Sequence, residues 1–162
     1  MMKQIIKYMP TRFLQLFGFL LLSGLLTAPA MAAAQIMTAP EAQEAVKEGK
    51  MILLDIRTPE EWREDGVAEG AYPVDLSAKN FGELLNKVLE QRDDKLLGMI
   101  CATGGRTGYV MSVLAQNKLT GIVDVSEGMH GRFFGGPGWL KRGLPVITAD
   151  EAQKAFDERF NK

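Results

Sequence analysis

The chain has 162 residues, of which 46% are hydrophobic and 24% are charged, and this composition is typical of one globular domain with its own core. The formal net charge is −1, and no basic tract follows residue 34, which argues against nucleic acid as a partner. The single cysteine excludes an internal disulfide, and one cysteine with one histidine cannot build a metal site.

Residues 1–34 have the three-part pattern of a secretory signal peptide. Residues 1–12 hold three basic side chains and no acidic one, residues 13–26 carry no charge, and an alanine-rich stretch follows. As a helix, the uncharged part would reach only about 21 Å, short of the roughly 30 Å of a hydrocarbon core. We therefore expect cleavage after residue 32 or 34, a periplasmic or secreted domain of residues 35–162, and no stable membrane insertion after cleavage. An uncleaved membrane anchor is the alternative.

Three apolar runs indicate buried strands, at residues 51–56, 96–101 and 122–125. They are nearly continuous rather than alternating, as expected for strands that are covered on both faces of a parallel sheet. Residues 35–37 and 71–74 are weaker strand candidates.

Four helices between and after these strands have recognisable starts. Three begin with a capping box, in which a threonine and a glutamate three residues later satisfy backbone N–H groups; the pairs are Thr38–Glu41, Thr58–Glu61 and Thr148–Glu151. Asn80 with Glu83 marks the fourth start, and an apolar stripe at helical spacing follows it. Alternating strands and helices predict a single α/β domain with an open sandwich architecture.

A further helix is expected at residues 107–119, and it is apolar on nearly all sides. Its first charged residue is Lys118. We expect this helix to be packed against the sheet and covered by its neighbours.

The loop at residues 101–106 (CATGGR) separates a predicted buried strand from this helix. Sites in open parallel sheets form beyond the carboxyl ends of strands, which is where this loop must lie. Gly104 and Gly105 favour a turn whose N–H groups face inward, and the helix N-terminus and Arg106 add positive charge. Such surroundings lower a thiol pKa from about 8.5 to roughly 3.5–7.5, so Cys101 is a candidate nucleophile. The alternative is an inert cysteine in the core.

The same loop resembles the active-site loop of rhodanese-type sulfurtransferases. Other segments resemble that family in the same order, at residues 53–62 (LLDIRTPEEW), 66–73 (GVAEGAYP), 125–129 (VSEGM) and 143–146 (GLPV). The resemblance covers residues 36–147. It implies a rhodanese-like three-layer sandwich, with a five-stranded parallel sheet and helices on both faces.

The resemblance also implies a reaction that needs no cofactor. Cys101 would take sulfane sulfur from a small anionic donor such as thiosulfate, become a persulfide, and pass the sulfur to a thiol or cyanide acceptor. Arg106 would steer the donor, and Asp55 and Arg57 would support the loop without touching substrate. The substrate-binding positions implied around the outer sulfur are Ala102, Thr103, Gly104, Gly105 and Thr107.

Two features depart from the family pattern. Val67 stands where a histidine is usual, and residues 130–142 form a longer closing segment that is rich in glycine, proline and aromatic residues. That segment could line a binding mouth, or it could be a surface turn packed onto the domain. His130 is the only histidine, and we expect it to have a structural role because an ionised thiol needs no general base.

Two other functions compete with sulfur transfer. Phosphatases and arsenate reductases of similar fold use a Cys-to-Arg cradle, but five residues separate the two there, whereas four separate Cys101 from Arg106. The shorter loop favours one sulfur atom over a bound phosphate. A non-catalytic sulfur-binding or adaptor module is the third reading, and the intact Cys101 and Arg106 argue against it.

Overall fold

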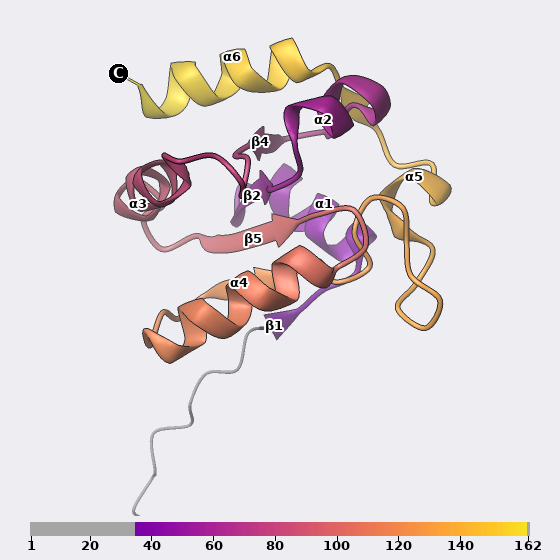
Figure 1. Cartoon of the computed structure of the whole chain (residues 1–162), viewed down its shortest axis with the longest axis horizontal. Coiled ribbons are helices and arrows are strands. Elements are labelled where there is room, and N and C mark those ends of the chain that lie inside the picture. The colour runs from indigo at the N-terminus through magenta and orange to yellow at the C-terminus, as the bar shows by residue number, and fades with distance from the viewer. Residues whose placement is uncertain (1–34, 162) are drawn as a thin grey trace, which may run out of the picture. The chain divides into compact units, whose positions relative to one another are not determined.

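The computed structural model describes residues 35–161, which form a five-stranded sheet with helices on both faces (Figure 1). The sheet order is β1-β6-β5-β2-β4, and every neighbouring pair is parallel. The strands are β1 (Gln35–Ile36), β2 (Met51–Asp55), β4 (Ala71–Pro73), β5 (Leu96–Ile100) and β6 (Ile122–Asp124). The predicted fold class is therefore confirmed, both weak strand candidates included. The predicted signal peptide lies outside the described residues.

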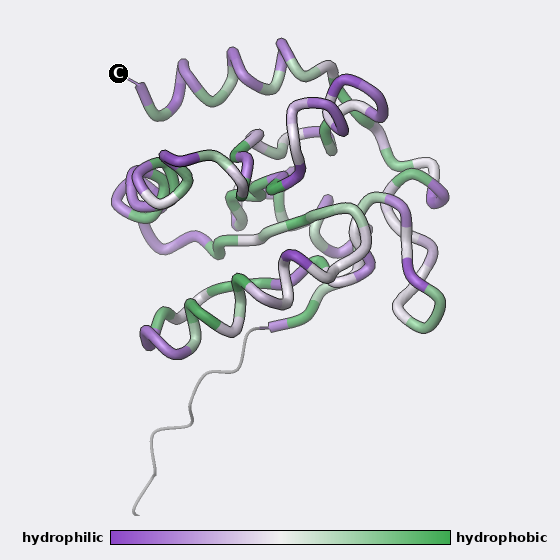
Figure 2. Tube along the Cα trace, in the orientation of Figure 1, coloured by the Kyte–Doolittle hydropathy of each residue, from purple (hydrophilic) through white to green (hydrophobic). Residues whose placement is uncertain are grey.

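The continuous apolar runs are explained by two cores, one on each face of the sheet. Along β2, Ile52 and Leu54 enter one hydrophobic cluster, while Met51 and Leu53 enter the other. Successive side chains of a strand point to opposite faces, so a strand covered on both sides needs apolar residues at every position. Figure 2 shows this as hydrophobic colour along β2 and β5.

The helices form the two outer layers. Helices α3 (Phe81–Glu90), α4 (Gly105–Gln116) and α6 (Ala149–Phe160) contribute to the first cluster. Helices α1 (Ala39–Lys47) and α5 (Gly138–Lys141) contribute to the second, together with Trp62 of α2 (Pro59–Asp65). Two short strands, β3 (Val67–Ala68) and β7 (Val146–Ile147), pair antiparallel in a separate sheet that the sequence did not predict.

All four predicted helix starts are confirmed, and the three predicted capping boxes form as well. Thr38, Thr58 and Thr148 each complete a capping box with the glutamate three residues later. Helix α3 begins after Asn80 as predicted, although the Asn80 side chain makes no capping hydrogen bond with the first turn of the helix. Its backbone, at φ −95° and ψ 10°, is not in the extended conformation that aims a side-chain oxygen at the first turn.

Helix α4 corrects one expectation. Residues Thr107, Val110, Met111 and Leu114 are buried, and their spacing defines one face of the helix. Tyr109 is 68% exposed and Val113 is 39% exposed, so the described part of the chain does not cover the opposite face. Apolar composition alone therefore overestimated the burial of this helix. No helix within residues 35–161 combines the length and apolar character needed to cross a membrane.

Candidate active site

Cys101 directly follows β5, the central strand, at the carboxyl edge of the sheet. Its carbonyl accepts a hydrogen bond from the Met129 N–H at 2.8 Å, and the neighbouring Ala102 carbonyl accepts one from His130 N–H at 2.9 Å. The segment after β6 thereby holds the loop in place. Cys101 itself is only 1% exposed.

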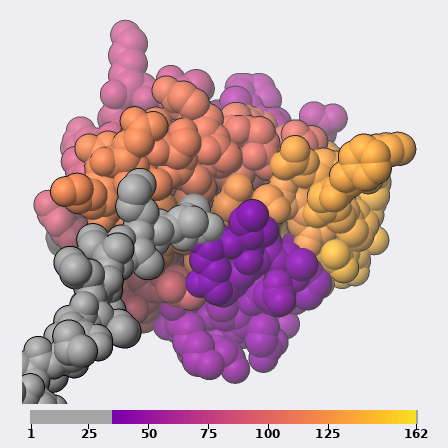
Figure 3. Space-filling view, turned by 90° about the horizontal axis from the view of Figure 1, so that it is seen from below, coloured from indigo at the N-terminus to yellow at the C-terminus, as the bar shows by residue number. Residues whose placement is uncertain are grey.

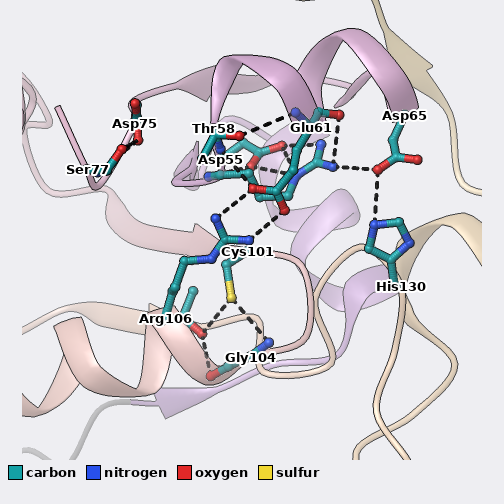
Figure 4. Close-up of polar contacts among 12 residues, drawn as sticks. Asp55, Thr58, Glu61, Asp65, Asp75, Ser77, Cys101, Gly104, Arg106 and His130 are labelled. Carbon is teal, nitrogen blue, oxygen red and sulfur yellow. Dashed lines mark hydrogen bonds and ion pairs between the residues drawn. The ribbon is translucent and has the colours of Figure 1, made fainter.

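The loop directs a backbone donor at the cysteine sulfur. The Gly104 N–H donates to Cys101 Sγ at 3.2 Å, and Thr107 Oγ1 lies 3.9 Å from the same sulfur (Figure 4). Thr107 in turn donates its hydroxyl hydrogen to the Gly104 carbonyl at 3.1 Å. The loop therefore places a backbone N–H donor and the N-terminus of α4 beside the sulfur of Cys101.

Gly104 is required here for two reasons. It has a φ of +83°, in the left-handed region, and a Cβ built on it would overlap the Ser126 carbonyl oxygen. Gly105 is different, because a Cβ there would meet nothing within 4 Å and its φ is not in that region. The expected inward turn therefore depends on Gly104, whereas Gly105 is simply the first residue of α4.

Arg106 lies beside Cys101 but binds Glu61. Its two terminal nitrogens donate to the two Glu61 carboxylate oxygens at 2.7 and 2.6 Å (Figure 4). This pairing with Arg106 outweighs partial burial and lowers the pKa of Glu61 from its usual value to about 2. The pKa of Arg106 is raised chiefly by Glu61, with a smaller contribution from Cys101. Steering of an anionic donor by Arg106 remains a prediction.

Asp55 and Arg57 form a fully buried ion pair that supports the loop through a helix. Arg57 donates to Asp55 through Nε and Nη2, and its Nη1 donates to Asp65 Oδ2 at 3.0 Å. These contacts fix α2 against the end of β2. Since α2 carries Glu61, the buried pair positions the residue that binds Arg106. Asp55 and Arg57 therefore support the Cys101 loop indirectly, through Glu61 and Arg106.

His130 also joins the loop to α2. Its Nε2 lies 3.0 Å from Asp65 Oδ2, the atom that Arg57 also contacts (Figure 4). In the described part of the chain its side chain pairs with Asp65 and makes no hydrogen bond with Cys101, which is compatible with the structural role expected for it. Within residues 35–161, no group of three His, Cys, Asp or Glu side chains is arranged to hold a metal ion.

Sequence reasoning did not assign three acidic residues that shape the site. Glu61 was predicted only as a helix cap. Glu127 is buried, and its carboxylate accepts hydrogen bonds from the Ala39 and Gly138 N–H groups and from Arg142 Nε. Asp124 ends β6 beneath the loop, and its Oδ1 is buried without a hydrogen-bond partner among the described residues. An acid at the carboxyl end of an apolar strand was the available signal for Asp124.

The closing segment, residues 130–142, is packed onto the domain at one point and exposed at another. Trp139 is fully buried in the second core, as a packed turn requires. Phe133 and Phe134 are 92% and 96% exposed, and their rings pack edge-to-face at a centroid distance of 4.7 Å. Of the two alternatives for this segment, a turn packed onto the domain describes Trp139 but not Phe133 and Phe134.

Residues 38–131 match the family model of the rhodanese-like domain. The chain belongs to the rhodanese-like domain family. The family match is shorter than the predicted range of 36–147 and ends just before Arg132.

Solved structures support the same fold. A protein from M. tuberculosis has 23% sequence identity and a TM-score of 0.57, with 72% of this chain and 98% of that chain covered. A rhodanese-related protein from Thermoplasma volcanium has 27% identity and a TM-score of 0.50, with coverage of 70% and 97%. The polysulfide-sulfur transferase homodimer from Wolinella succinogenes has 19% identity and a TM-score of 0.52, with coverage of 72% and 80%. A search of curated proteins gives no match.

Proposed function

We propose that this rhodanese-like domain is a sulfurtransferase in which Cys101 carries sulfane sulfur. The Cys101 thiolate attacks the outer sulfur of an anionic donor such as thiosulfate. A new S–S bond forms, the old one breaks, and sulfite leaves with the bonding electron pair. A thiol or cyanide acceptor then attacks the outer sulfur and restores the thiolate. No cofactor takes part in this sequence.

The Gly104 N–H at 3.2 Å from Cys101 Sγ is the observation that carries the proposal. It supplies a fixed donor where negative charge must be held, both on the starting thiolate and on the departing thiolate. The N–H groups of the first turn of a helix have no partners within that helix, so the start of α4 offers further donors to the outer sulfur.

The surroundings favour sulfur over phosphate. A bound phosphoryl group would need a cationic side chain to donate hydrogen bonds to its oxygens. Arg106 is the cation of the loop, but both of its terminal nitrogens already donate to Glu61. The loop also closes directly on the sulfur atom, since Cys101 is 1% exposed. A single sulfur atom needs less displacement of this loop than a tetrahedral oxyanion.

The test is the intact mass of the protein before and after incubation with thiosulfate. We expect a gain of one sulfur atom, which is removed again by cyanide. Cys101→Ser is the control, because an alcohol is far less acidic than a thiol and should not react. Loss of the gain in this variant, with an unchanged circular dichroism spectrum, supports the proposal. An unmodified wild-type protein would overturn it in favour of a non-catalytic module.

We also propose that the domain works outside the cytoplasm, as the pattern of residues 1–34 suggests. Its sulfur donor and acceptor would then be species present in that compartment.

A further inference from the structure

Residues 132–136, which follow the part of the chain that matches the family model, form a small hairpin at the active-site side of the sheet. The Arg132 N–H donates to the Gly136 carbonyl at 2.9 Å, and the Gly135 N–H donates to the Arg132 carbonyl at 3.0 Å. Figure 1 shows this segment before α5, on the side toward which β5 points, and in Figure 3 atoms of its colour project from the surface. Phe133 and Phe134 lie at its exposed tip.

The Arg132 side chain reaches from this hairpin toward the cysteine loop. A Cβ built on Gly104 would lie 3.3 Å from Arg132 Nη1, and Gly104 is the residue whose N–H contacts Cys101 Sγ. A Cβ on Gly135 would overlap the Arg132 stem, so a glycine at that position lets the stem fold back across the hairpin. The guanidinium therefore lies at the edge of the loop.

The positive charge of Arg132 also acts on an acidic residue of the site. Burial raises the pKa of Asp124, beneath the loop, and the Arg132 charge opposes that rise. Arg132 also borders a surface hollow lined by Gly131, Arg132, Phe133, Gly136, Pro137 and Lys141. Lys141 places a further positive charge at the same hollow.

Arg132 and Arg106 differ in what they already bind. Arg106 is held by Glu61 through two short hydrogen bonds. Arg132 is exposed, and no other residue within 35–161 forms a hydrogen bond or ion pair with its guanidinium. An exposed guanidinium without a carboxylate partner can bind an incoming oxyanion without first giving up an internal contact.

We propose that Arg132 is a specificity-determining residue that binds the oxyanion end of the sulfur donor, while Arg106 holds the loop through Glu61. The substrate class is then a sulfane-sulfur compound that carries a sulfonate-like anionic group. This inference deepens the proposed sulfur transfer and rests on it for the identity of the donor. The binding of anions near Cys101 can be tested whether or not the protein transfers sulfur.

The first experiment compares two alkylating reagents that differ in charge. Iodoacetate and iodoacetamide both form an S–C bond with the thiolate and release iodide, but only iodoacetate is an anion. Arg132→Ala should slow alkylation of Cys101 by iodoacetate about 3- to 10-fold and change the rate with iodoacetamide by less than about 2-fold. Arg132→Lys keeps the positive charge and should react with iodoacetate at nearly the wild-type rate.

Arg92→Ala is the matched control. Its guanidinium contacts the Thr120 and Gly121 carbonyls, at the start of β6 and therefore at the opposite end of the sheet. This variant should behave as wild type with both reagents. Equal rates for wild type and Arg132→Ala with iodoacetate would overturn the proposal, and so would an equal loss with both reagents, because that would indicate a changed thiolate. Failure of both reagents to modify wild-type Cys101 would also overturn it.

The second experiment measures sulfur loading from thiosulfate. Arg132→Ala should raise KM for thiosulfate about 3- to 10-fold with little change in kcat, because it removes a binding contact outside the reacting atoms. Suppose that Arg132→Ala slows alkylation by iodoacetate alone, but thiosulfate forms no persulfide on the wild-type protein. That result would support the anion site at Arg132 and overturn the proposed sulfur transfer. Persulfide formation with an unchanged KM for thiosulfate in Arg132→Ala would support sulfur transfer and overturn the role of Arg132.

Discussion

Glu61 binds Arg106 through both carboxylate oxygens, at 2.7 and 2.6 Å, and so joins the first turn of α2 to the first turn of α4. Glu61 also accepts the capping hydrogen bond from Thr58 N–H. One carboxylate therefore starts a helix and fixes the arginine next to Cys101. The ends of two strands, β2 and β5, are connected through this contact.

Glu61→Gln should lower the free energy of unfolding at neutral pH by about 1 kcal/mol, because it removes a partly exposed ion pair while an amide can still cap α2. The folded-state pKa of Glu61, at about 2, is below the usual 4.5. Its contribution is therefore complete above roughly pH 4.5 and is lost as pH falls toward about 2. Urea unfolding of both proteins from pH 7 to pH 3 measures this, and the difference should shrink with acid.

Glu41→Gln is the control for that measurement. Glu41 occupies the equivalent capping position in α1 but is exposed, and it forms no ion pair with any residue in the described range 35–161. Its substitution should give the smaller loss of stability. Identical pH profiles for the two variants would show that the Arg106 pair contributes nothing beyond capping.

Gly104→Ala should destabilise the domain by about 2–4 kcal/mol and abolish sulfur loading, since alanine disfavours a positive φ and its Cβ would collide with the Ser126 carbonyl. Gly105→Ala should be neutral or stabilising by up to about 1 kcal/mol, because it adds a methyl to an open position in the first turn of a helix. Thermal unfolding and intact mass after thiosulfate measure both effects. Equal behaviour of the two variants would contradict the assigned role of Gly104.

Much of the fold could be predicted because each signal was local. The capping threonines and the apolar runs act within a few residues, and the strands and helices start where these signals place them. Helix α4 shows the limit, since Tyr109 is apolar in character yet exposed. Burial depends on what packs against a helix, and composition does not contain that information.

The site could be predicted only in part for the same reason. Cys101 and its loop form a continuous stretch of sequence, so their proximity is implied. The contact between Glu61 and Arg106 joins residues 45 positions apart, and Arg132 approaches Gly104 only because a glycine-rich hairpin folds back. A charged residue shows in a sequence, but its partner depends on tertiary packing.

The exported form of the protein should begin near Ala33 or Gln35. The basic, apolar and small-residue parts of 1–34 predict cleavage by a signal peptidase. N-terminal sequencing of the protein recovered from each cell fraction measures this, with most of the protein expected outside the cytoplasm. An intact Met1 in the membrane fraction would instead establish an uncleaved anchor.

The protein should transfer sulfur from thiosulfate and should not hydrolyse aryl phosphates. The physical reason is the size and direction of the Cys101 loop: four residues separate Cys101 from Arg106, and the Gly104 N–H points at the sulfur itself. A phosphate bound above Cys101 would need donors spread around three oxygens, and the Arg106 guanidinium would have to leave Glu61 to join them. Both activities are measured on one preparation, with Cys101→Ser as the baseline.

A second variant makes that comparison sharper. One glycine inserted between Thr103 and Gly104 makes five residues separate Cys101 from Arg106, the spacing expected of an oxyanion-hydrolysing loop, and moves the Gly104 N–H away from Cys101 Sγ. Sulfur transfer should then fall at least about tenfold, which corresponds to the loss of a charge-assisted hydrogen bond worth roughly 1.5–3 kcal/mol. If the wild-type protein instead hydrolyses aryl phosphates well above the Cys101→Ser baseline and gains no sulfur by mass, the loop is an oxyanion cradle after all, and Arg106 must exchange Glu61 for phosphate during turnover.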